Sequence, residues 1–324
     1  MGGFDMRHSS RRQLLGLSLT FSTLSTLFAA AGGTTAIASE RQAHAASSAM
    51  VATTLPGFRP GDRLSLDGVS VLVPRPGLGA WGAAVKVGGP RVLGVQTGRD
   101  GSVTVYRQGF VTGHGAGGKA GSAIEAVNPK SACTDGAYSL TGVSWRSRVD
   151  WYFKTSSTPN EITQSDALSA LRDAMRNLTQ VNNDCGLRDK VNANSLYRGG
   201  TIRSANIGTG STCSGSDGVN VVDFGNLAAG DLGYACWWTW GGSTVESDMR
   251  LNSTEYSWAV DLGGCLAKYS VEDVATHELG HTFGLNDLSE RLHPSLTMSL
   301  IMLPCQNAET TLGLGDVRGL KAIY

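Results

Sequence analysis

The segment from Ala275 to Asp287, ATHELGHTFGLND, constrains the fold of this chain more than any other stretch. Ser270, with Asp273 three residues later, matches the pattern of an N-terminal capping box. We therefore predict a helix that begins after Ser270 and continues through VEDVATHELGH. Because an α-helix has 3.6 residues per turn, His277 and His281 share one face and direct both imidazoles at one point.

Two histidines in this arrangement are typical of a zinc site. Neutral imidazoles bind Zn²⁺ and leave other coordination positions open. Glu278 lies about 100° round the helix from His277, where its carboxylate can reach a water held by the ion. Zinc lowers the pKa of such a water to about 7, so Glu278 can take its proton as it attacks a carbonyl and can then protonate the leaving amine. Chance would produce His-Glu-x-x-His in roughly three of a thousand chains of this composition, so the pattern indicates a hydrolytic site with Glu278 as catalytic residue.

A third ligand is expected beyond the helix. Gly284 tolerates the left-handed backbone dihedrals needed to end the helix and turn the chain. Asp287 follows, ten residues after His277, and a carboxylate oxygen binds zinc at about 2.0–2.2 Å. The alternatives are His293, a nitrogen ligand six residues later, a distant Glu309, and an Asp287 that only caps the turn. We predict Asp287 as the third ligand beside the two histidines.

Composition excludes several classes of function. The chain has 324 residues, of which 41% are hydrophobic and 17% charged, enough to bury one large core or two modest ones. Lys+Arg and Asp+Glu are equal at 27 each, so nothing favours a nucleic-acid partner. Any activity must come from a local site. We expect a monomer that acts on a protein or peptide substrate, without nucleic acid or membrane.

The first 45 residues read as an export signal peptide. Positive charges precede an apolar run, and small-residue sites follow at 36–38 and 43–45. Arg11 and Arg12 resemble a twin-arginine signal, with an ordinary secretory signal as the alternative. No other stretch reaches the roughly 18 apolar residues of a membrane span. We therefore predict a secreted, extracellular and soluble protein.

All six cysteines lie after residue 130, and an even number in an exported chain favours disulfides. No C-x-x-C pair is present, so a cysteine zinc site is not expected. Six cysteines allow fifteen pairings. Of these we predict the sequential one, which joins Cys133 to Cys185, Cys213 to Cys236 and Cys265 to Cys305.

The chain divides at a glycine-rich stretch. Residues 46–110 contain short alternating segments separated by glycine, and Asp100-Gly101 between two β-rich runs predicts a hairpin. Residues 111–123 contain five glycines, which predicts a flexible linker with a solvated His114. The β-rich segment before the linker is either a removed pro-region or a retained accessory module, and both remain open. Residues 124–324 form the predicted domain that carries the site.

After the linker the pattern becomes mixed α and β. VDWYFKT alternates like a strand, and apolar residues at helical spacing predict a long helix over 162–183. GVNVVDFG, LGYACWWTW and ESDMRLNS are strand candidates, and GDVRGLKAIY predicts a final helix. Trp237, Trp238 and Trp240 either pack the core beneath a strand or form an aromatic wall beside a substrate. The predicted fold class is α+β.

The segment HELGHTFGLND resembles the extended zinc motif of the metzincin metallopeptidases, H-E-x-x-H-x-x-G-x-x-H/D. The resemblance covers about 200 residues, so it implies a zinc metallopeptidase domain over 124–324. Its fold would be a twisted, mostly parallel sheet with an edge strand, an active-site helix and a C-terminal helix. Gly233, Tyr234 and Ala235 occupy the place of the edge strand that pairs with extended substrate. Met298 occupies that of the methionine turn beneath the zinc, with Met302 in reserve.

Within this family the chain resembles matrixin-like members, but Asp287 stands where they usually carry His and is similar to snapalysin-type members. The latency cysteine of matrixin pro-segments is missing, because residues 46–132 contain no Cys. The resemblance implies a secreted zinc endopeptidase, and it leaves a structural Ca²⁺ open as a further ion. The alternative is a secreted, non-catalytic binding protein with a degenerate metal site. Glu278 argues against it, because a structural zinc needs no general base.

Overall fold

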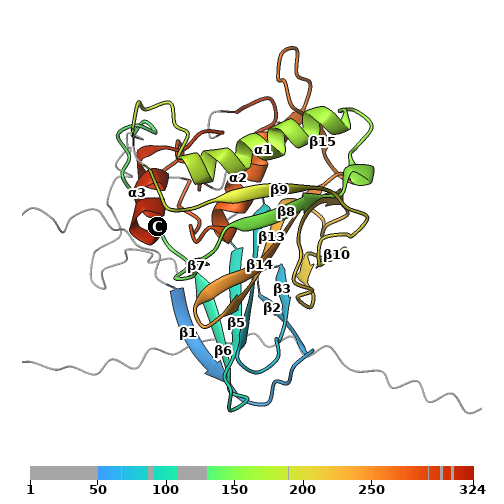
Figure 1. Ribbon diagram of the computed structural model, residues 1–324, viewed down its shortest axis with the longest axis vertical. Helices are drawn as coiled ribbons and strands as arrows, with labels where there is room; N and C mark the ends of the chain where they lie inside the picture. The colour runs from blue at the N-terminus through green and yellow to red at the C-terminus, as the bar shows by residue number, and fades with distance from the viewer. Residues whose placement is uncertain are drawn as a thin grey trace, which may run out of the picture. The chain divides into compact units, whose positions relative to one another are not determined.

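The chain is organised around a mixed sheet of ten strands (Figure 1). In the computed structural model the described residues are 50–66, 68–86, 91–108, 130–188, 190–290, 292–299, 302–307 and 310–324. All of them belong to the unit formed by residues 43–324. The predicted export signal at 1–45, the predicted linker at 111–123 with His114, and Glu309 lie outside the described residues.

The strand order of this sheet is β1-β6-β5-β4-β13-β14-β12-β8-β9, with β7 beside β14. The bounds are β1 (Met50–Leu55), β4 (Leu78–Lys86), β5 (Arg91–Thr97), β6 (Val103–Gln108), β7 (Ser144–Trp145), β8 (Val149–Phe153), β9 (Ser195–Gly200), β12 (Asn220–Gly225), β13 (Asp231–Trp240) and β14 (Ser243–Asn252). Strands β9, β8, β12 and β14 pair in parallel, whereas β13 and the strands from β4 to β1 pair antiparallel. This arrangement confirms a mixed α+β fold. The sheet is not mostly parallel as predicted, because the strands of residues 50–108 add antiparallel pairings to it.

Two smaller sheets and three α-helices complete the described fold. A four-stranded sheet has the order β10-β11-β3-β2, and β15 pairs with β16. Their bounds are β2 (Arg63–Leu66), β3 (Val69–Leu72), β10 (Ile207–Gly208), β11 (Thr212–Cys213), β15 (Ser257–Ala259) and β16 (Lys268–Ser270). The helices are α1 (Gln164–Gln180), α2 (Val271–Thr282) and α3 (Leu314–Ile323), with a 3₁₀ turn, η1, at Thr155–Ser157. These bounds confirm the three predicted helices.

Helix α1 begins where the sequence supplies a cap and buries the face that its apolar spacing predicts. The Thr163 hydroxyl accepts a hydrogen bond from the Asp166 amide at 3.1 Å, which satisfies one of the free amides of the first turn. Leu171, Met175 and Leu178 are buried in the main core. Helix α1 packs against α2, which in turn contacts β13, β14 and β4. Helix α2 is thus held between α1 and the middle of the sheet.

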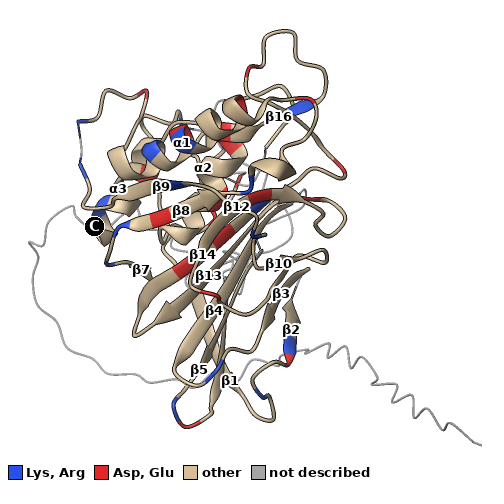
Figure 2. Ribbon diagram, turned by 45° about the vertical axis from the view of Figure 1, so that its right-hand side comes forward, with Lys and Arg blue, Asp and Glu red and all other residues tan. Residues whose placement is uncertain are grey.

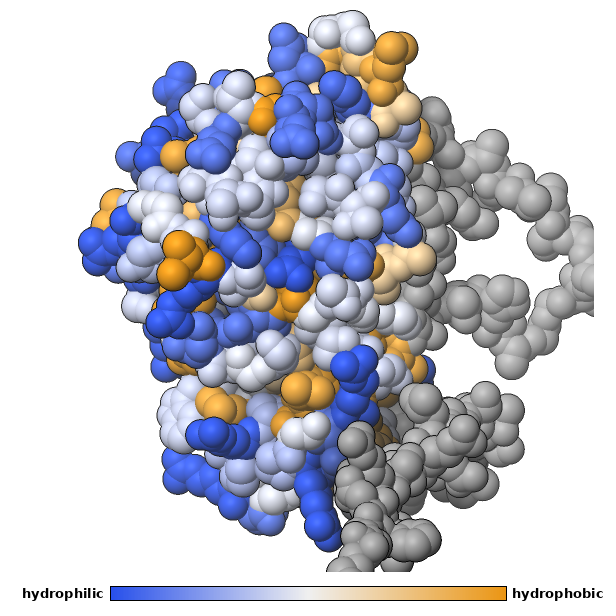
Figure 3. Space-filling view, turned by 90° about the vertical axis from the view of Figure 1, so that its right-hand side faces the viewer, coloured by the Kyte–Doolittle hydropathy of each residue, from blue (hydrophilic) through white to orange (hydrophobic). Residues whose placement is uncertain are grey.

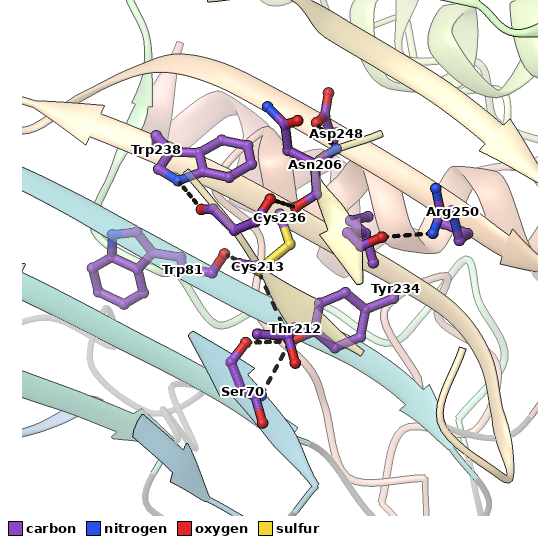
Figure 4. The surroundings of a disulfide bond; sticks show 12 residues. Ser70, Trp81, Asn206, Thr212, Cys213, Tyr234, Cys236, Trp238, Asp248 and Arg250 are labelled. Atoms are coloured by element: carbon purple, nitrogen blue, oxygen red, sulfur yellow. Dashed lines mark hydrogen bonds between the residues drawn. A yellow bond between two sulfur atoms is a disulfide. The ribbon is translucent and has the colours of Figure 1, made fainter. Parts of the chain in front are cut away.

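Apolar residues form cores on both faces of the sheet. Successive side chains of a strand point to opposite faces, so Tyr234 and Trp238 belong to one core and Trp237 to another. The core around Tyr234 contains residues from distant parts of the chain (Figure 4). Its members include Val69, Val71, Ala80, Ala84 and Val95 before residue 108, and Ile207, Cys213, Tyr234, Cys236 and Trp238 after residue 130. The N-terminal strands therefore share a core with the rest of the unit.

The cysteines pair as predicted. Disulfides join Cys133 to Cys185, Cys213 to Cys236 and Cys265 to Cys305, and no free cysteine remains. The middle bond lies inside the shared core (Figure 4). Three disulfides indicate an extracellular or otherwise oxidising environment.

Buried charges on β14 have internal partners. The Arg250 guanidinium lies 2.6 Å from the Asp223 carboxylate on the neighbouring strand β12. Asp248 accepts hydrogen bonds from the Asn206 and Val221 amides, while burial raises the pKa of its carboxyl well above the usual value. These groups connect β14 to neighbouring segments and satisfy the polar atoms that folding buries.

Residues 50–108 supply strands to the same sheet. The predicted hairpin is present, because the Gly98 amide donates to the Ser102 carbonyl oxygen between β5 and β6, and Gly101 has φ +84°. Strand β4 pairs with β13 from Leu78 opposite Trp240 to Lys86 opposite Asp231. Strand β13, with Gly233, Tyr234 and Ala235, is therefore an interior strand and not the edge strand that was predicted. The reason is that β4 covers its otherwise open side.

The surface carries charges of both signs without a segregated patch. Figure 2 shows acidic and basic residues scattered over strands, helices and loops. On the face in Figure 3 hydrophilic residues predominate and hydrophobic ones are dispersed. Among the described residues, no helix combines the length and the apolar composition needed to cross a membrane.

Candidate metal centre

Helix α2 positions two of the predicted ligands. Ser270 caps it, because the hydroxyl oxygen of Ser270 accepts a hydrogen bond from the Asp273 amide at 3.2 Å. Val274 and Leu279 pack in the main core, which anchors the helix along its length. His277 and His281 are completely buried, one turn apart. The predicted helix and its shared histidine face are confirmed.

The end of α2 brings the chain back toward these histidines. Gly284 has φ +97°, its amide donates to the His281 carbonyl, and the Leu285 amide donates to the Gly280 carbonyl. This is the hydrogen-bond pattern of a Schellman motif, in which a left-handed residue ends the helix. A Cβ at Gly284 would also lie 2.5 Å from the Val143 carbonyl oxygen. Both observations explain why glycine occupies the turn.

The segment after the turn is pinned by backbone hydrogen bonds. The Asn286 amide donates to the Ser139 carbonyl oxygen, and the Leu288 amide donates to the Met298 carbonyl oxygen at 2.8 Å. Asp287 lies between these two contacts and is completely buried. Its carboxylate is thus fixed on the side that faces the two imidazoles.

Three ligand atoms converge in the space between α2 and this segment. Asp287 Oδ1 lies 3.2 Å from His277 Nε2 and 3.2 Å from His281 Nε2, and the two Nε2 atoms are also 3.2 Å apart. Ligands of a tetrahedral zinc with bonds of about 2.0–2.1 Å lie about 3.3–3.4 Å from each other. The triangle therefore has the size of one face of a tetrahedral site. Within the described part of the chain this is the one group of three His, Cys, Asp or Glu side chains placed to hold a metal ion.

The outer ring nitrogens show which tautomer the histidines adopt. His277 Nδ1 lies 2.9 Å from the Thr297 carbonyl oxygen, and His281 Nδ1 lies 3.2 Å from the Leu285 carbonyl oxygen. A carbonyl oxygen only accepts hydrogen bonds, so each Nδ1 carries a proton. With the proton on Nδ1, a ring that binds a metal ion does so through the Nε2 lone pair, which here points inward. Two lone pairs and a carboxylate oxygen thus meet at one point, and this donor set fits a cation.

The Asp287 carboxyl is the acidic member of this group. Burial raises its pKa, whereas positive charge on the two neighbouring imidazoles and hydrogen bonds from them lower it by more, so the net pKa falls well below the usual value. Asp287 is therefore a carboxylate at neutral pH. A structural Ca²⁺ stays a prediction, because no second group of three such side chains is found in the described ranges.

Glu278 lies on α2, directly after His277 in the chain, and its carboxyl is close to the three candidate ligands. Its Oε1 accepts a hydrogen bond from the Val85 amide at 3.1 Å, and its Oε2 has no hydrogen-bond partner among the described residues. Burial is the main cause that raises the pKa of Glu278 to about 8, against the opposing effects of His277 and the Val85 amide. A Cβ at Gly233 would lie 2.7 Å from Oε1, so only glycine there lets β13 approach so closely. The carboxyl can thus hold or accept a proton next to the ligands.

Met298 packs against α2, and its predicted place beneath a zinc ion stays a prediction. It is buried, and a Cβ at Gly280 would lie 2.5 Å from its sulfur. Asp316 on α3 fixes the backbone turn at Thr297 and Met298. Its carboxylate accepts hydrogen bonds from the Thr297 amide at 2.9 Å and the Met298 amide at 3.3 Å. The same turn presents the Thr297 carbonyl oxygen to His277. The sequence prediction missed Asp316, whose only signal is an acidic residue in the first turn of the final helix.

The competing residues lie elsewhere. His293 Nδ1 is 2.8 Å from Asp135 Oδ2, so its side chain is engaged outside the triangle. Met302 is buried in the main core. The structure brings Asp287, and not His293, together with the two histidines.

The three tryptophans of β13 have different roles. The Trp237 ring is stacked on His281 with centroids 6.2 Å apart, and on Trp81 with centroids 6.1 Å apart. Trp238 points to the other face and donates from Nε1 to the Ser214 carbonyl oxygen. Trp240 is half exposed. Trp238 therefore packs a core, whereas Trp237 is an aromatic neighbour of the candidate site.

Comparisons with known proteins add no assignment. The sequence matches no known protein family, and a search of curated proteins also found no match. The chemistry of the described side chains, and the resemblance of HELGHTFGLND to one known motif, are therefore the basis for any function.

Proposed function

We propose that the protein is a secreted, zinc-dependent endopeptidase of the metzincin type. One observation carries the proposal: Asp287 Oδ1 and the Nε2 atoms of His277 and His281 converge at mutual distances of 3.2 Å, with the Glu278 carboxyl beside them. Three protein ligands leave one coordination position open, which distinguishes catalytic from structural zinc sites. Histidine nitrogens with one carboxylate oxygen also suit zinc better than calcium or magnesium, which prefer oxygen ligands.

The chain's own groups would divide the reaction between them. When bound, zinc supplies a Lewis acid that polarises the scissile carbonyl and makes a water molecule more acidic. His277, His281 and Asp287 hold the ion, and Thr297 and Leu285 orient the two imidazoles through their carbonyl oxygens. Glu278 Oε2 accepts the proton of the attacking water and then passes it to the nitrogen of the leaving amine. Burial raises the pKa of the Glu278 carboxyl, which favours uptake of the water's proton by its ionised form.

The metzincin type is supported by the elements around the site. Parallel strands β9, β8, β12 and β14 are followed in the sheet by antiparallel β13, and α2 packs over this region. The helix ends at Gly284, Met298 lies below it, and α3 closes the chain. The substrate would be a protein or peptide segment. Three disulfides agree with the proposed secretion.

One observation favours a different function, that of a non-catalytic metal-binding protein. Glu278 and all three candidate ligands are completely buried, so none of them presents surface to a substrate in this arrangement. A non-catalytic metal-binding protein would need no proton acceptor, yet Glu278 lies directly beside the ligands. We therefore rank this function second and test both candidate functions in one experiment.

The deciding experiment compares the wild-type chain with Glu278→Ala. Zinc content is measured by mass spectrometry of the purified proteins, and casein hydrolysis is measured with and without a chelator. We expect about one zinc per chain in both proteins, and at least about a 100-fold loss of turnover in the variant, the usual effect of losing a general base. Near-normal hydrolysis by Glu278→Ala, or by the chelated wild type, would contradict the proposal.

A further inference from the structure

The two histidines of the candidate metal centre differ in how firmly a hydrogen bond holds each ring. His277 Nδ1 lies 2.9 Å from its carbonyl oxygen, whereas His281 Nδ1 lies 3.2 Å from the Leu285 carbonyl oxygen, at the long end for such a bond. His281 also lies in the last turn of α2, which ends at Thr282. A single acceptor defines a direction but not a plane, so contacts on the faces of the His281 ring become important.

Two aromatic rings restrict the plane of His281. The His277 ring meets it nearly at a right angle, with centroids 4.9 Å apart and an interplanar angle of 83°. The Trp237 ring is parallel to it within 7°, with centroids 6.2 Å apart. Aromatic rings at this separation and angle form an offset stack. Trp237 therefore lies along a face of the His281 imidazole.

The orientation of Trp237 is itself fixed by strand pairing. Trp237 is fully buried on β13, and Trp81 lies directly opposite it on β4. The two indoles are parallel within 8°, with centroids 6.1 Å apart. Gly94 on β5 provides the room for Trp81, because a Cβ at Gly94 would overlap the Trp81 ring. Since two packed indoles cannot turn independently, the fold sets the plane of Trp237.

The indole nitrogens show that hydrogen bonding does not explain Trp237. On the opposite face of β13, Trp238 Nε1 donates to the Ser214 carbonyl oxygen at 3.2 Å (Figure 4). The Nε1 atoms of Trp237 and Trp81 are buried and have no hydrogen-bond partner among the described residues. Buried tryptophans usually find such a partner, and an unpaired N–H costs stability. Phenylalanine would avoid this cost, so packing alone does not account for an indole at position 237.

An indole face beside His281 favours the metal-bound form of that ring. The faces of an indole carry negative charge density. An imidazole that binds a divalent cation takes up part of the positive charge, so a parallel indole stabilises the bound ring more than the free ring. Trp237 achieves this without adding a charge to the site.

We propose that Trp237 is a positioning residue of the metal centre. Its ring holds the His281 imidazole in the plane that metal binding requires, and it stabilises the imidazole once the metal is bound. The inference rests on the proposed function and deepens it, because it gives a role at the same site to a residue that acts only through His281. Groups that orient a metal ligand typically change the affinity 10–100-fold.

The first test compares Trp237→Leu with Trp238→Leu in the full chain. Both tryptophans are buried neighbours on β13, but they face opposite sides of the sheet. Both substitutions remove a large core side chain and should lower the free energy of unfolding measured in urea. Only Trp237→Leu should weaken zinc binding, by about tenfold in competition with a chromophoric chelator. Trp237→Phe keeps a ring that can stack, so its affinity should stay within about threefold of the wild type.

A spectroscopic readout separates positioning of His281 from a general loss of stability. Cobalt(II) in place of zinc gives visible absorption bands that depend on the geometry of the ligands. We expect the bands of Trp237→Leu to differ from those of the wild type. The bands of Trp237→Phe and Trp238→Leu should match the wild type.

Fluorinated tryptophan at position 237 covers the case in which Trp237→Leu does not fold. Fluorine withdraws electron density from the faces of the indole with little change of shape, so the stack remains but its attraction for a positive ring weakens. We expect zinc affinity to fall with each fluorine added at position 237. The same series at position 238 should leave the affinity constant.

The outcomes separate the role of Trp237 from the peptidase proposal. Wild-type affinity in Trp237→Leu, or throughout the fluorinated series if that variant does not fold, would overturn the role of Trp237. Equal losses of affinity in Trp237→Leu and Trp238→Leu would also overturn it, because a general loss of stability explains them. If the variants behave as expected but the wild type hydrolyses no casein, the role of Trp237 is supported and the peptidase proposal is contradicted. Wild-type protein that binds no zinc would overturn both.

Discussion

The N-terminal strands, residues 50–108, and the C-terminal region, residues 130–324, contribute to the same sheet but differ in what they add to the site. The C-terminal region supplies every candidate ligand and the residues that orient them. The N-terminal strands supply no candidate ligand, yet β4 and β1 contact Glu278 and Asn286. One region builds the proposed site and the other covers it.

The contacts made by the two regions also differ in sequence range. His281 Nδ1 faces a carbonyl oxygen four residues away, and His277 Nδ1 faces one twenty residues away. By contrast, 193 residues separate Val85 from Glu278, and 236 separate Met50 from Asn286. Closing a longer loop costs more entropy, so the covering contacts depend on the packing of many other residues.

The largest expected effect is the loss of zinc affinity when one of the three candidate ligands is removed. Asp287→Ala removes the carboxylate oxygen that lies 3.2 Å from both Nε2 atoms. Loss of a partner that only orients a ligand typically costs 10–100-fold in affinity, so loss of the ligand should weaken zinc binding at least about 100-fold. Affinity is measured by competition with a chromophoric chelator. His293→Ala, whose ring faces Asp135, should bind zinc like the wild type, and the reverse result would reassign the third ligand.

The next effect is a difference in unfolding free energy between alanine variants of two glycine turns, one in each region. Gly284→Ala places a side chain at φ +97° and 2.5 Å from the Val143 carbonyl oxygen, so we expect a loss of roughly 3 kcal/mol in unfolding free energy. Gly101→Ala, in the β5–β6 hairpin at φ +84°, has no atom within 4 Å of the new Cβ and should lose only about 1 kcal/mol. Urea unfolding of both variants measures the difference. Equal losses would show that steric crowding at Gly284 adds nothing to the cost of its backbone conformation.

The smallest effect should come from one hydroxyl between the regions, that of Tyr234, which donates to the Ser70 carbonyl oxygen and accepts from the Ser70 amide. Tyr234→Phe removes the hydroxyl that donates to the Ser70 carbonyl oxygen but keeps the ring in the shared core. We expect a loss of about 1 kcal/mol in unfolding free energy, the usual contribution of such a bond, with unchanged zinc content. A loss of zinc in this variant would mean that attachment of the N-terminal strands is needed to form the site, and not only to cover it.

Much of the fold was predictable because its signals are local. The cap at Ser270, the histidine spacing and Gly284 lie within fifteen consecutive residues and define both ends of α2. Alternating apolar residues located β8, β12, β13 and β14, and Asp100-Gly101 located the β5–β6 hairpin. The disulfide pairing also agreed with the prediction. Strand β9 was missed, because SLYRGG contains two glycines and few apolar residues.

The candidate site was predictable to the same extent and for the same reason. The helical repeat fixes the positions of His277, Glu278 and His281 relative to one another. Asp287 follows a turn whose glycine is visible in the sequence. Asp316 was not predictable, because an acidic residue near the start of a helix ordinarily serves that helix. Only the packing of α3 brings its carboxylate to the Thr297 and Met298 amides.

Residue types and spacings were sufficient to determine the helix, its cap, its glycine turn and the four residues of the proposed site. The tertiary structure alone decided that β13 is an interior strand and that β4 is its partner. The physical reason is that backbone hydrogen bonds between strands are the same for every sequence, so a strand edge does not specify which segment will cover it. Here the partner is selected by burial, through Trp81 and Val85 on one face and the core around Tyr234 on the other.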